Sequence, residues 1–231
     1  MSQMEGIDVY KVGSGPNAII VVYDIFGMGM QVKQVCDVLA DAGFNVAMPD
    51  FYEGAPWDPA NFPPPDREAF MTWVKSGNRS FDETVKAKIE IVMMLMADNF
   101  GAKSFGVLGF CWGGYIAMRS AAELPIKAAG TAHPAFLDAT LAEAVKVPFC
   151  SLPCPGDFPV EDLKAVLDKK PFGDQCVYKC FEDMQHGFCA GRGDYSDPLQ
   201  KERASEAMGI FAVRLLYPYP TSLSSFSFLF F

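Results

Sequence analysis

Short apolar runs alternate with segments of helical periodicity along almost the whole chain, and this alternation constrains the fold most. Residues 18–23 (AIIVVY) form a β-branched run bounded by Pro16 and Gly27, which is typical of a strand buried on both faces. Residues 32–39 follow with valine and leucine at helical spacing. A strand followed by a helix is therefore the first predicted unit.

The same alternation continues to residue 216. Further strands are predicted at residues 44–48, 104–110, 127–132, 148–152 and 176–181, and helices at residues 66–74, 82–98, 112–122, 160–168 and 199–216. Strands joined by helices of this size form right-handed βαβ units. We therefore expect an α/β fold with a doubly wound, mostly parallel sheet and helices on both faces. The proline-rich segment 56–65 is expected to form a loop outside the core.

Length and composition favour a single domain. The chain has 231 residues, of which 50% are hydrophobic, so it can bury a sizeable core. We expect one α/β domain over residues 1–217 and a tail over residues 218–231, which is rich in Phe and Ser and carries no charge. For this tail, a poorly ordered terminus is favoured over a role in docking a partner.

The charge balance excludes several kinds of partner. The 19 Lys and Arg and the 28 Asp and Glu leave a net charge of −9 at pH 7, and no basic stripe is present. Neither nucleic acid nor a membrane surface is therefore an expected partner. The N-terminus lacks the features of a signal peptide, and the seven cysteines lack the spacing of a disulfide framework. These features predict a cytoplasmic protein with reduced thiols.

The sharpest local motif is GFCWGG at residues 109–114, between a predicted strand and a predicted helix. A nucleophile on a strand-to-helix turn needs small residues two positions before and after it, because the chain there passes too close for a Cβ atom. Gly109 and Gly113 meet this requirement. The turn also places Cys111 at a helix N-terminus, which favours a thiolate and a developing oxyanion. We interpret Cys111 as a nucleophile rather than as a buried cysteine in a glycine-rich turn.

Chain order indicates which histidine and which acid would serve that nucleophile. In α/β-hydrolase folds the acid and then the histidine follow the nucleophile along the chain. His186 follows a late predicted strand and fits this order, whereas His133 comes too early and is expected to line the pocket or to be structural. Asp157 lies after the strand between them and is the expected acid, with Asp162 as a competitor inside the next helix. A turn or helix-capping role is the alternative for Asp157.

Other patterns are interpreted as structural. The pairs Cys150/Cys154 and Cys176/Cys180 are predicted to be buried core thiols rather than metal ligands, because no histidine partners them. Residues 27–29 (GMG) lack the third glycine of a dinucleotide-binding loop. No cofactor and no metal ion are therefore expected.

Taken together, these motifs resemble the dienelactone hydrolases, also called carboxymethylenebutenolidases. The resemblance spans roughly residues 17–216 and rests on VYDIFG at 22–27, PDFY at 49–52, the GFCWGG turn, GDFPV at 156–160 and HGF at 186–188. It implies an α/β-hydrolase fold. It also implies a catalytic triad of Cys111, His186 and Asp157 that hydrolyses lactones or activated carboxylic esters through an acyl-enzyme.

The resemblance assigns further residues. It implies that the backbone N–H groups of Ile25 and Trp112 form an oxyanion hole. Asp24 stands where the family carries a glutamate that holds the resting thiol. Arg192 is the expected counterpart of the arginines that bind a substrate carboxylate, and Arg79 is the weaker candidate. The residues expected to hold the resting thiol or to line the pocket are Asp24, Tyr52, His133, Phe188 and Arg192.

Two other classes of function stay open. The chain could be a non-catalytic relative that binds a ligand or docks a partner, or a thiol redox sensor that acts through Cys111. The intact order of the triad favours the hydrolase. The expected partner is then a small-molecule ester or lactone, and the expected oligomeric state is a monomer or a weak homodimer.

Overall fold

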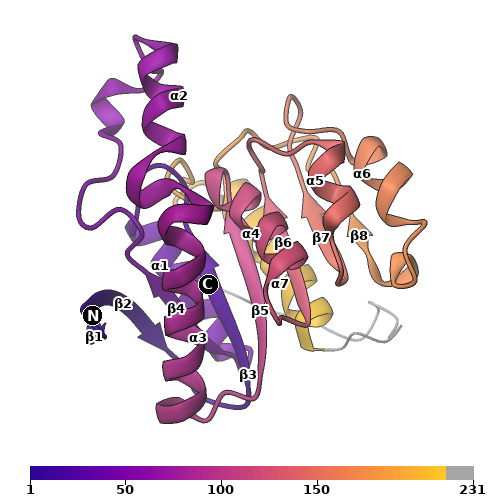
Figure 1. Ribbon diagram of the computed structural model, residues 1–231. Helices are drawn as coiled ribbons and strands as arrows, with labels where there is room; N and C mark the ends of the chain where they lie inside the picture. Colours follow the sequence, from indigo (N-terminus) through magenta and orange to yellow (C-terminus); the bar gives the residue numbers. More distant parts are fainter. Residues whose placement is uncertain (217–231) are drawn as a thin grey trace.

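The strands of the computed structural model, which describes residues 1–216, lie side by side in one sheet (Figure 1). They are β1 (Ser2–Met4), β2 (Ile7–Val12), β3 (Asn17–Val22), β4 (Asn45–Pro49), β5 (Ser104–Phe110), β6 (Ala128–Ala132), β7 (Phe149–Leu152) and β8 (Val177–Tyr178). Their order across the sheet is β1-β2-β4-β3-β5-β6-β7-β8. The pairs from β4 to β8 are parallel, whereas β1 and β2 add an antiparallel edge.

Helices cover both faces of this sheet (Figure 1). They are α1 (Met30–Asp41), α2 (Arg67–Lys75), α3 (Lys86–Phe100), α4 (Trp112–Glu123), α5 (Ala139–Ala144), α6 (Val160–Leu167) and α7 (Pro198–Leu216). Helices α3 and α4 pack on one face, and α1 and α7 pack on the other. The predicted doubly wound, mostly parallel α/β sheet is thereby confirmed. Within residues 1–216, no helix combines the length and the apolar character needed to cross a membrane.

The centre of the sheet brings two loops to the same edge. Residues 19–22 of β3 have no solvent exposure, as a β-branched run covered on both faces predicts. In the register of the parallel pair, Val22 of β3 lies beside Gly109 of β5. The loops that follow these two strands therefore leave the sheet side by side. Open α/β sheets bind ligands outside this carboxyl edge.

The structure differs from the predicted elements mainly at the edges of the sheet. Strands β1 and β2 and the short helix α5 were not predicted. Strand β1 has three residues, and β2, which lies between β1 and β4, buries only Val9, so neither shows a continuous apolar run. The strand predicted at 176–181 is shortened to β8, which pairs with β7 alone. Cys176 and Cys180 are consequently half-buried, and their interpretation as buried core thiols is wrong.

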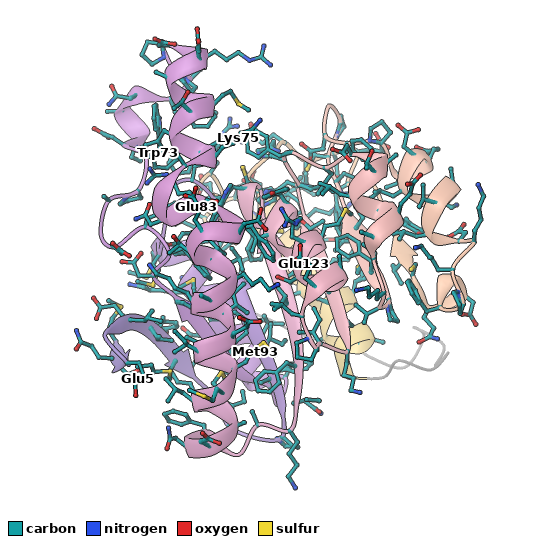
Figure 2. All side chains as sticks on the ribbon, in the orientation of Figure 1. Glu5, Trp73, Lys75, Glu83, Met93 and Glu123 are labelled. Carbon is teal, nitrogen blue, oxygen red and sulfur yellow. The ribbon has the colours of Figure 1, made fainter. Side chains whose placement is uncertain are left out.

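A helical excursion rises from the sheet between β4 and α3. We call residues 56–80 the arm; they include the proline-rich loop, the 3₁₀ turn η1 (Pro59–Asn61), helix α2 and the 3₁₀ turn η2 (Gly77–Arg79). Figure 2 shows Trp73 and Lys75 on α2, which projects from the body of the molecule. The Trp73 ring lies 5.1 Å from that of Trp57 and 5.4 Å from that of Tyr52. Aromatic packing therefore joins the arm to the loop after β4.

The predicted tail over residues 218–231 lies outside the described residues.

Candidate active site

Cys111 occupies a strained turn between β5 and α4. Its backbone has φ 53° and ψ −112°, a conformation that residues other than glycine rarely adopt. Two hydrogen bonds hold the turn, because the Cys111 carbonyl accepts from the N–H groups of Gly114 and Ala135, each at 2.9 Å. The side chain is 9% exposed. The strand, turn and helix thus lie where the GFCWGG motif predicted them.

The two glycines that flank the turn permit the close approach of α4 to the sheet. A Cβ atom on Gly109 would lie 1.8 Å from the Gly113 carbonyl oxygen. A Cβ atom on Gly113 would lie 2.2 Å from the carbonyl oxygen of Val22. Both contacts are with backbone, which cannot move aside without separating helix from sheet. Glycine at these positions is therefore a packing requirement of the turn.

The structure brings His186 and Asp157 to Cys111 in one hydrogen-bonded chain. Nδ1 of His186 lies 2.6 Å from Oδ1 of Asp157, whose side chain is 6% exposed. The other carboxylate oxygen of Asp157 accepts the N–H of Cys154 at 2.8 Å, which fixes its orientation. His186 also forms a side-chain hydrogen bond with Cys111. Since Nδ1 faces the carboxylate, Nε2 is the ring nitrogen left for the sulfur.

These contacts determine the charge of His186. Burial opposes a charged ring, but the hydrogen bonds with Asp157 and Cys111 outweigh it and raise the pKa of His186 to about 10. The imidazole is therefore protonated at neutral pH. It presents a positive charge to the cysteine sulfur on one side and to a carboxylate on the other.

Two backbone N–H groups next to Cys111 are available to a ligand. Trp112 is the first residue of α4, where N–H groups have no acceptor within the helix. Ile25 lies in the loop after β3, directly after Asp24. No acceptor in the described part of the chain pairs with either N–H group. Because β3 and β5 are neighbours, both N–H groups lie at the carboxyl edge beside the nucleophile turn.

Asp24 binds the backbone of two loops and forms no hydrogen bond with Cys111 among the described residues. Its Oδ1 accepts from the N–H of Phe26 at 2.8 Å, and its Oδ2 accepts from the N–H of Gly191 at 2.7 Å. Burial raises the pKa of Asp24 to about 6, although these two N–H groups and His186 act against the shift. With both oxygens occupied, the carboxylate ties the loop after β3 to the loop that carries His186.

His133 packs against the catalytic histidine candidate, Phe188 packs against His133, and neither residue has solvent exposure. The His133 ring lies 5.2 Å from that of His186 and 5.7 Å from that of Phe188, centroid to centroid. Neither ring nitrogen of His133 has a hydrogen-bond partner among the residues described. Burial, together with the charge of His186, lowers the pKa of His133 well below its usual range. His133 is therefore neutral and buttresses His186.

Tyr52 is fully buried beside the nucleophile turn. Its ring lies 5.0 Å from that of Trp112 and 4.9 Å from that of Tyr23. Its hydroxyl has no hydrogen-bond partner in residues 1–216. Tyr52 therefore places an aromatic ring and an uncommitted polar atom in the packing beside the nucleophile turn.

The two candidate arginines lie at the rim of the site. Arg192 is exposed on the loop after His186, where its guanidinium lies 5.4 Å from the centre of the Phe62 ring. Arg79 stacks on the Trp73 ring at 4.4 Å and donates to the Trp73 carbonyl and, at 2.7 Å, to Oδ1 of Asn78. Neither guanidinium forms an ion pair with another described residue. The same part of the chain holds no group of three or more His, Cys, Asp and Glu residues placed to bind a metal ion.

A cavity of about 510 Å³ lies beside the nucleophile turn and under the arm. Sequence reasoning missed it, because its walls come from the arm and the turn that follows it, from helix α4, and from helix α5 with the loop before it, which are distant in the sequence. One signal was present, since Tyr115 follows Trp112 by three residues and shares its face of α4. The lining residues are Val74, Lys75, Arg79, Ser80, Phe81, Asp82, Trp112, Tyr115, Phe136, Leu137, Asp138 and Leu141.

The fold and the arrangement around Cys111 define the class of protein. A mostly parallel, doubly wound sheet carries a residue on a strained strand-to-helix turn, a histidine from a later loop is hydrogen-bonded to this residue, and an acid from another loop is hydrogen-bonded to the histidine. This is the architecture of an α/β hydrolase. A putative dienelactone hydrolase from Klebsiella pneumoniae shares the fold with a TM-score of 0.66 and 19% identity, over 91% of this chain and 99% of that one.

Sequence comparisons give the family. The pattern of the dienelactone hydrolase family matches residues 7–212, and the chain therefore belongs to this family of carboxylic ester hydrolases. An AIM2 family protein from Schizosaccharomyces pombe is 32% identical over 215 residues, which cover 87% of this chain and 83% of that protein. A carboxymethylenebutenolidase homolog from Mus musculus is 28% identical over 217 residues, which cover 89% and 85% of the two chains.

Proposed function

We propose that this protein is a cysteine-dependent hydrolase that cleaves lactones or activated carboxylic esters through an acyl-enzyme on Cys111. The observation that carries the proposal is the hydrogen-bonded chain from Cys111 through His186 to Asp157 at the carboxyl edge of the sheet. Membership of the dienelactone hydrolase family supports the ester or lactone as substrate. Cys111, His186 and Asp157 then act together in two chemical steps.

The first step is acyl transfer to the cysteine. The Cys111 thiolate attacks the carbonyl carbon, a carbon–sulfur bond forms, and the carbonyl electron pair moves to the oxygen. The N–H groups of Ile25 and Trp112 donate to this oxyanion. The protonated His186 gives its proton to the departing alcohol oxygen as the carbon–oxygen bond breaks, while Asp157 holds the ring. In a lactone, that oxygen stays attached through the ring.

The second step is hydrolysis of the thioester. His186, now neutral, takes a proton from a water molecule, whose oxygen attacks the carbonyl carbon. The carbon–sulfur bond breaks, the carboxylic acid leaves, and the thiolate and the imidazolium are restored. The pKa of about 10 for His186 means that its ring already holds, at neutral pH, the proton that the first step gives to the leaving group.

The surrounding residues have supporting roles in this proposal. Asp24 joins the loop of Ile25 to the loop of His186, so it keeps an oxyanion donor and the base in one arrangement. His133 packs on His186 without adding a second positive charge, because its own ring is neutral. Arg192 is the proposed contact for a carboxylate on the substrate.

A small-molecule ester or lactone is the proposed partner, and a cytoplasmic location is proposed with it. The mouse relative is named a carboxymethylenebutenolidase homolog, and a structural neighbour from Butyrivibrio proteoclasticus is described as bound to ferulic acid. The cavity beside Trp112 combines aromatic and aliphatic walls with Lys75 and Arg79. We therefore propose aryl esters and lactones as the first substrates to assay.

The test is a screen of lactones and short aryl esters with the wild-type protein and with the variant Cys111→Ala. We expect turnover by the wild type and loss of all but a few per cent of it in the variant, with the fold intact. Iodoacetamide should label Cys111 faster than the other six cysteines. A variant that keeps most of the wild-type rate would overturn the proposal, and a wild-type protein inactive on every ester would favour the non-catalytic or redox alternatives.

A further inference from the structure

The hydroxyl of Tyr52 is a buried polar atom that the mechanism above does not use. It has no hydrogen-bond partner in the described residues, and the side chain has no exposure. Burying a hydroxyl without a partner costs free energy, and phenylalanine would fill the same volume without that cost. Packing alone therefore explains the ring of Tyr52 and leaves its hydroxyl unexplained.

The contacts of Tyr52 place its ring beside the nucleophile turn and beside the loop of Ile25. Its ring packs on Trp112 on one side and lies along the loop of Ile25 on the other, where its Cδ2 is 4.0 Å from the position of a Cβ atom on Gly27. The phenol lies within electrostatic range of both Cys111 and Asp24. Tyr52 therefore lies beside both the Trp112 side chain and the loop of Ile25, the two segments whose N–H groups form the proposed oxyanion hole.

The backbone of Tyr52 is held rigidly, so its ring has a defined direction. The N–H of Tyr52 donates to the Tyr23 hydroxyl oxygen at 2.8 Å and to Oδ1 of Asp50 at 3.0 Å. The Tyr23 hydroxyl donates to the same Asp50 oxygen at 2.9 Å. The ring is then enclosed by those of Tyr23, Trp73 and Trp112. A donor fixed before the substrate arrives stabilises developing charge without reorganisation.

We propose that the Tyr52 hydroxyl is a third donor of the oxyanion hole and hydrogen-bonds the substrate carbonyl oxygen as charge develops on it. This inference rests on the proposed function. As the carbon–sulfur bond forms, the carbonyl electron pair moves to the oxygen, and Tyr52 donates a hydrogen bond to it while keeping its own proton. Burial, with the neighbouring Tyr23, Asp24 and Cys111, raises the pKa of Tyr52 well above its usual value, so the hydroxyl stays a donor at working pH.

The test is the variant Tyr52→Phe, which removes only this oxygen. We expect kcat and kcat/KM for an aryl ester to fall together by about 10- to 100-fold with KM unchanged, because the lost contact is made in the transition state. The affinity for phenylacetaldehyde, which adds to Cys111 and leaves an oxygen in the hole, should fall by a similar factor. The rate of alkylation by iodoacetamide should stay the same, because that reaction develops no oxyanion.

A matched control separates this role from a structural one. Tyr10→Phe removes a hydroxyl that bonds Asp37 on α1, from strand β2, which pairs with β1 and β4 and not with the strands β3 and β5 that lead into the site, and it should leave all three measurements unchanged. The Tm of Tyr52→Phe should equal or exceed that of the wild type, since no hydrogen bond is lost.

The inference would be overturned if Tyr52→Phe kept the wild-type kcat/KM. It would also be overturned if the variant lost affinity for phenylacetaldehyde and rate of alkylation by the same factor. If the wild type turned over no ester, the proposed function would fail on its own, and aldehyde binding would still decide the role of Tyr52.

Discussion

Two buried carboxylates, those of Asp157 and Asp24, lie near His186 and have different roles. Asp157 binds the imidazole directly, whereas Asp24 binds two backbone N–H groups and reaches His186 only through space. The first carboxylate stabilises a charge on the ring. The second holds two loops together and is itself destabilised by burial. Substitutions of these two residues should therefore affect activity and stability in different ways.

Replacing Asp157 by Asn should alter the pH dependence of catalysis. The pKa of His186 is raised to about 10, so the protonated ring is favoured in the folded protein and is lost as the pH rises through that value. Without the carboxylate, the alkaline limb of the kcat/KM profile should move to lower pH. The kcat itself should fall by about 10²- to 10⁴-fold, because the ring loses its orientation. A profile of kcat/KM against pH measures both effects, and an alkaline limb at the wild-type position would contradict the role of Asp157.

Replacing Asp24 by Asn should remove a pH dependence of stability. The folded pKa of Asp24, about 6, lies above the ordinary value of 3.8, so its contribution to stability is present below that ordinary value and lost as the pH rises through 6. Asn does not titrate. The free energy of unfolding of the variant, relative to the wild type, should therefore improve between pH 4 and pH 7 by up to about 3 kcal/mol. Urea unfolding at a series of pH values measures this difference. If the free energies of unfolding of the two proteins changed with pH in parallel, Asp24 would not be the source of the pH dependence.

At the scale of elements, the contact between α4 and the strands β3 and β5 determines where the nucleophile lies. In Gly113→Ala the new Cβ atom would overlap backbone of β3, so the variant should lose about 3 kcal/mol or more of unfolding free energy, or fail to fold. Gly29→Ala is the matched control, because its φ is −65° and the nearest atom is the end of the Gln31 side chain at 3.6 Å. That variant should change stability by less than about 0.5 kcal/mol. Equal denaturation midpoints for the two variants would contradict the close approach of α4 to β3 at Gly113.

The elements that the sequence predicts well are those with a complete apolar pattern. Residues 104–110 were predicted as a strand and form β5, because a buried central strand shows a continuous apolar run. The antiparallel edge of β1 and β2 was not predicted, since a half-covered strand has no such run. Strand β8 also lies at an edge of the sheet, where it pairs only with β7 and is half-buried, and it is shorter than predicted.

At the scale of the whole molecule, the candidate site combines predictable and unpredictable parts. Cys111, Asp157 and His186 could be found in the sequence, because each lies in a recognisable loop after a strand and their order along the chain is constrained. The partner of Asp24 could not, because Gly191 meets it only after both loops fold across the sheet edge. The cavity under the arm depends on the same long-range packing.

The proposed acyl group on Cys111 can be detected by mass spectrometry. The protein is mixed with p-nitrophenyl acetate, quenched in acid during the first turnover, digested and mapped. We expect a burst of nitrophenol and an acetyl group on the peptide that contains Cys111, and we expect both to be absent in Cys111→Ala. Turnover without an acyl adduct, or an adduct on another residue together with activity in Cys111→Ala, would contradict it.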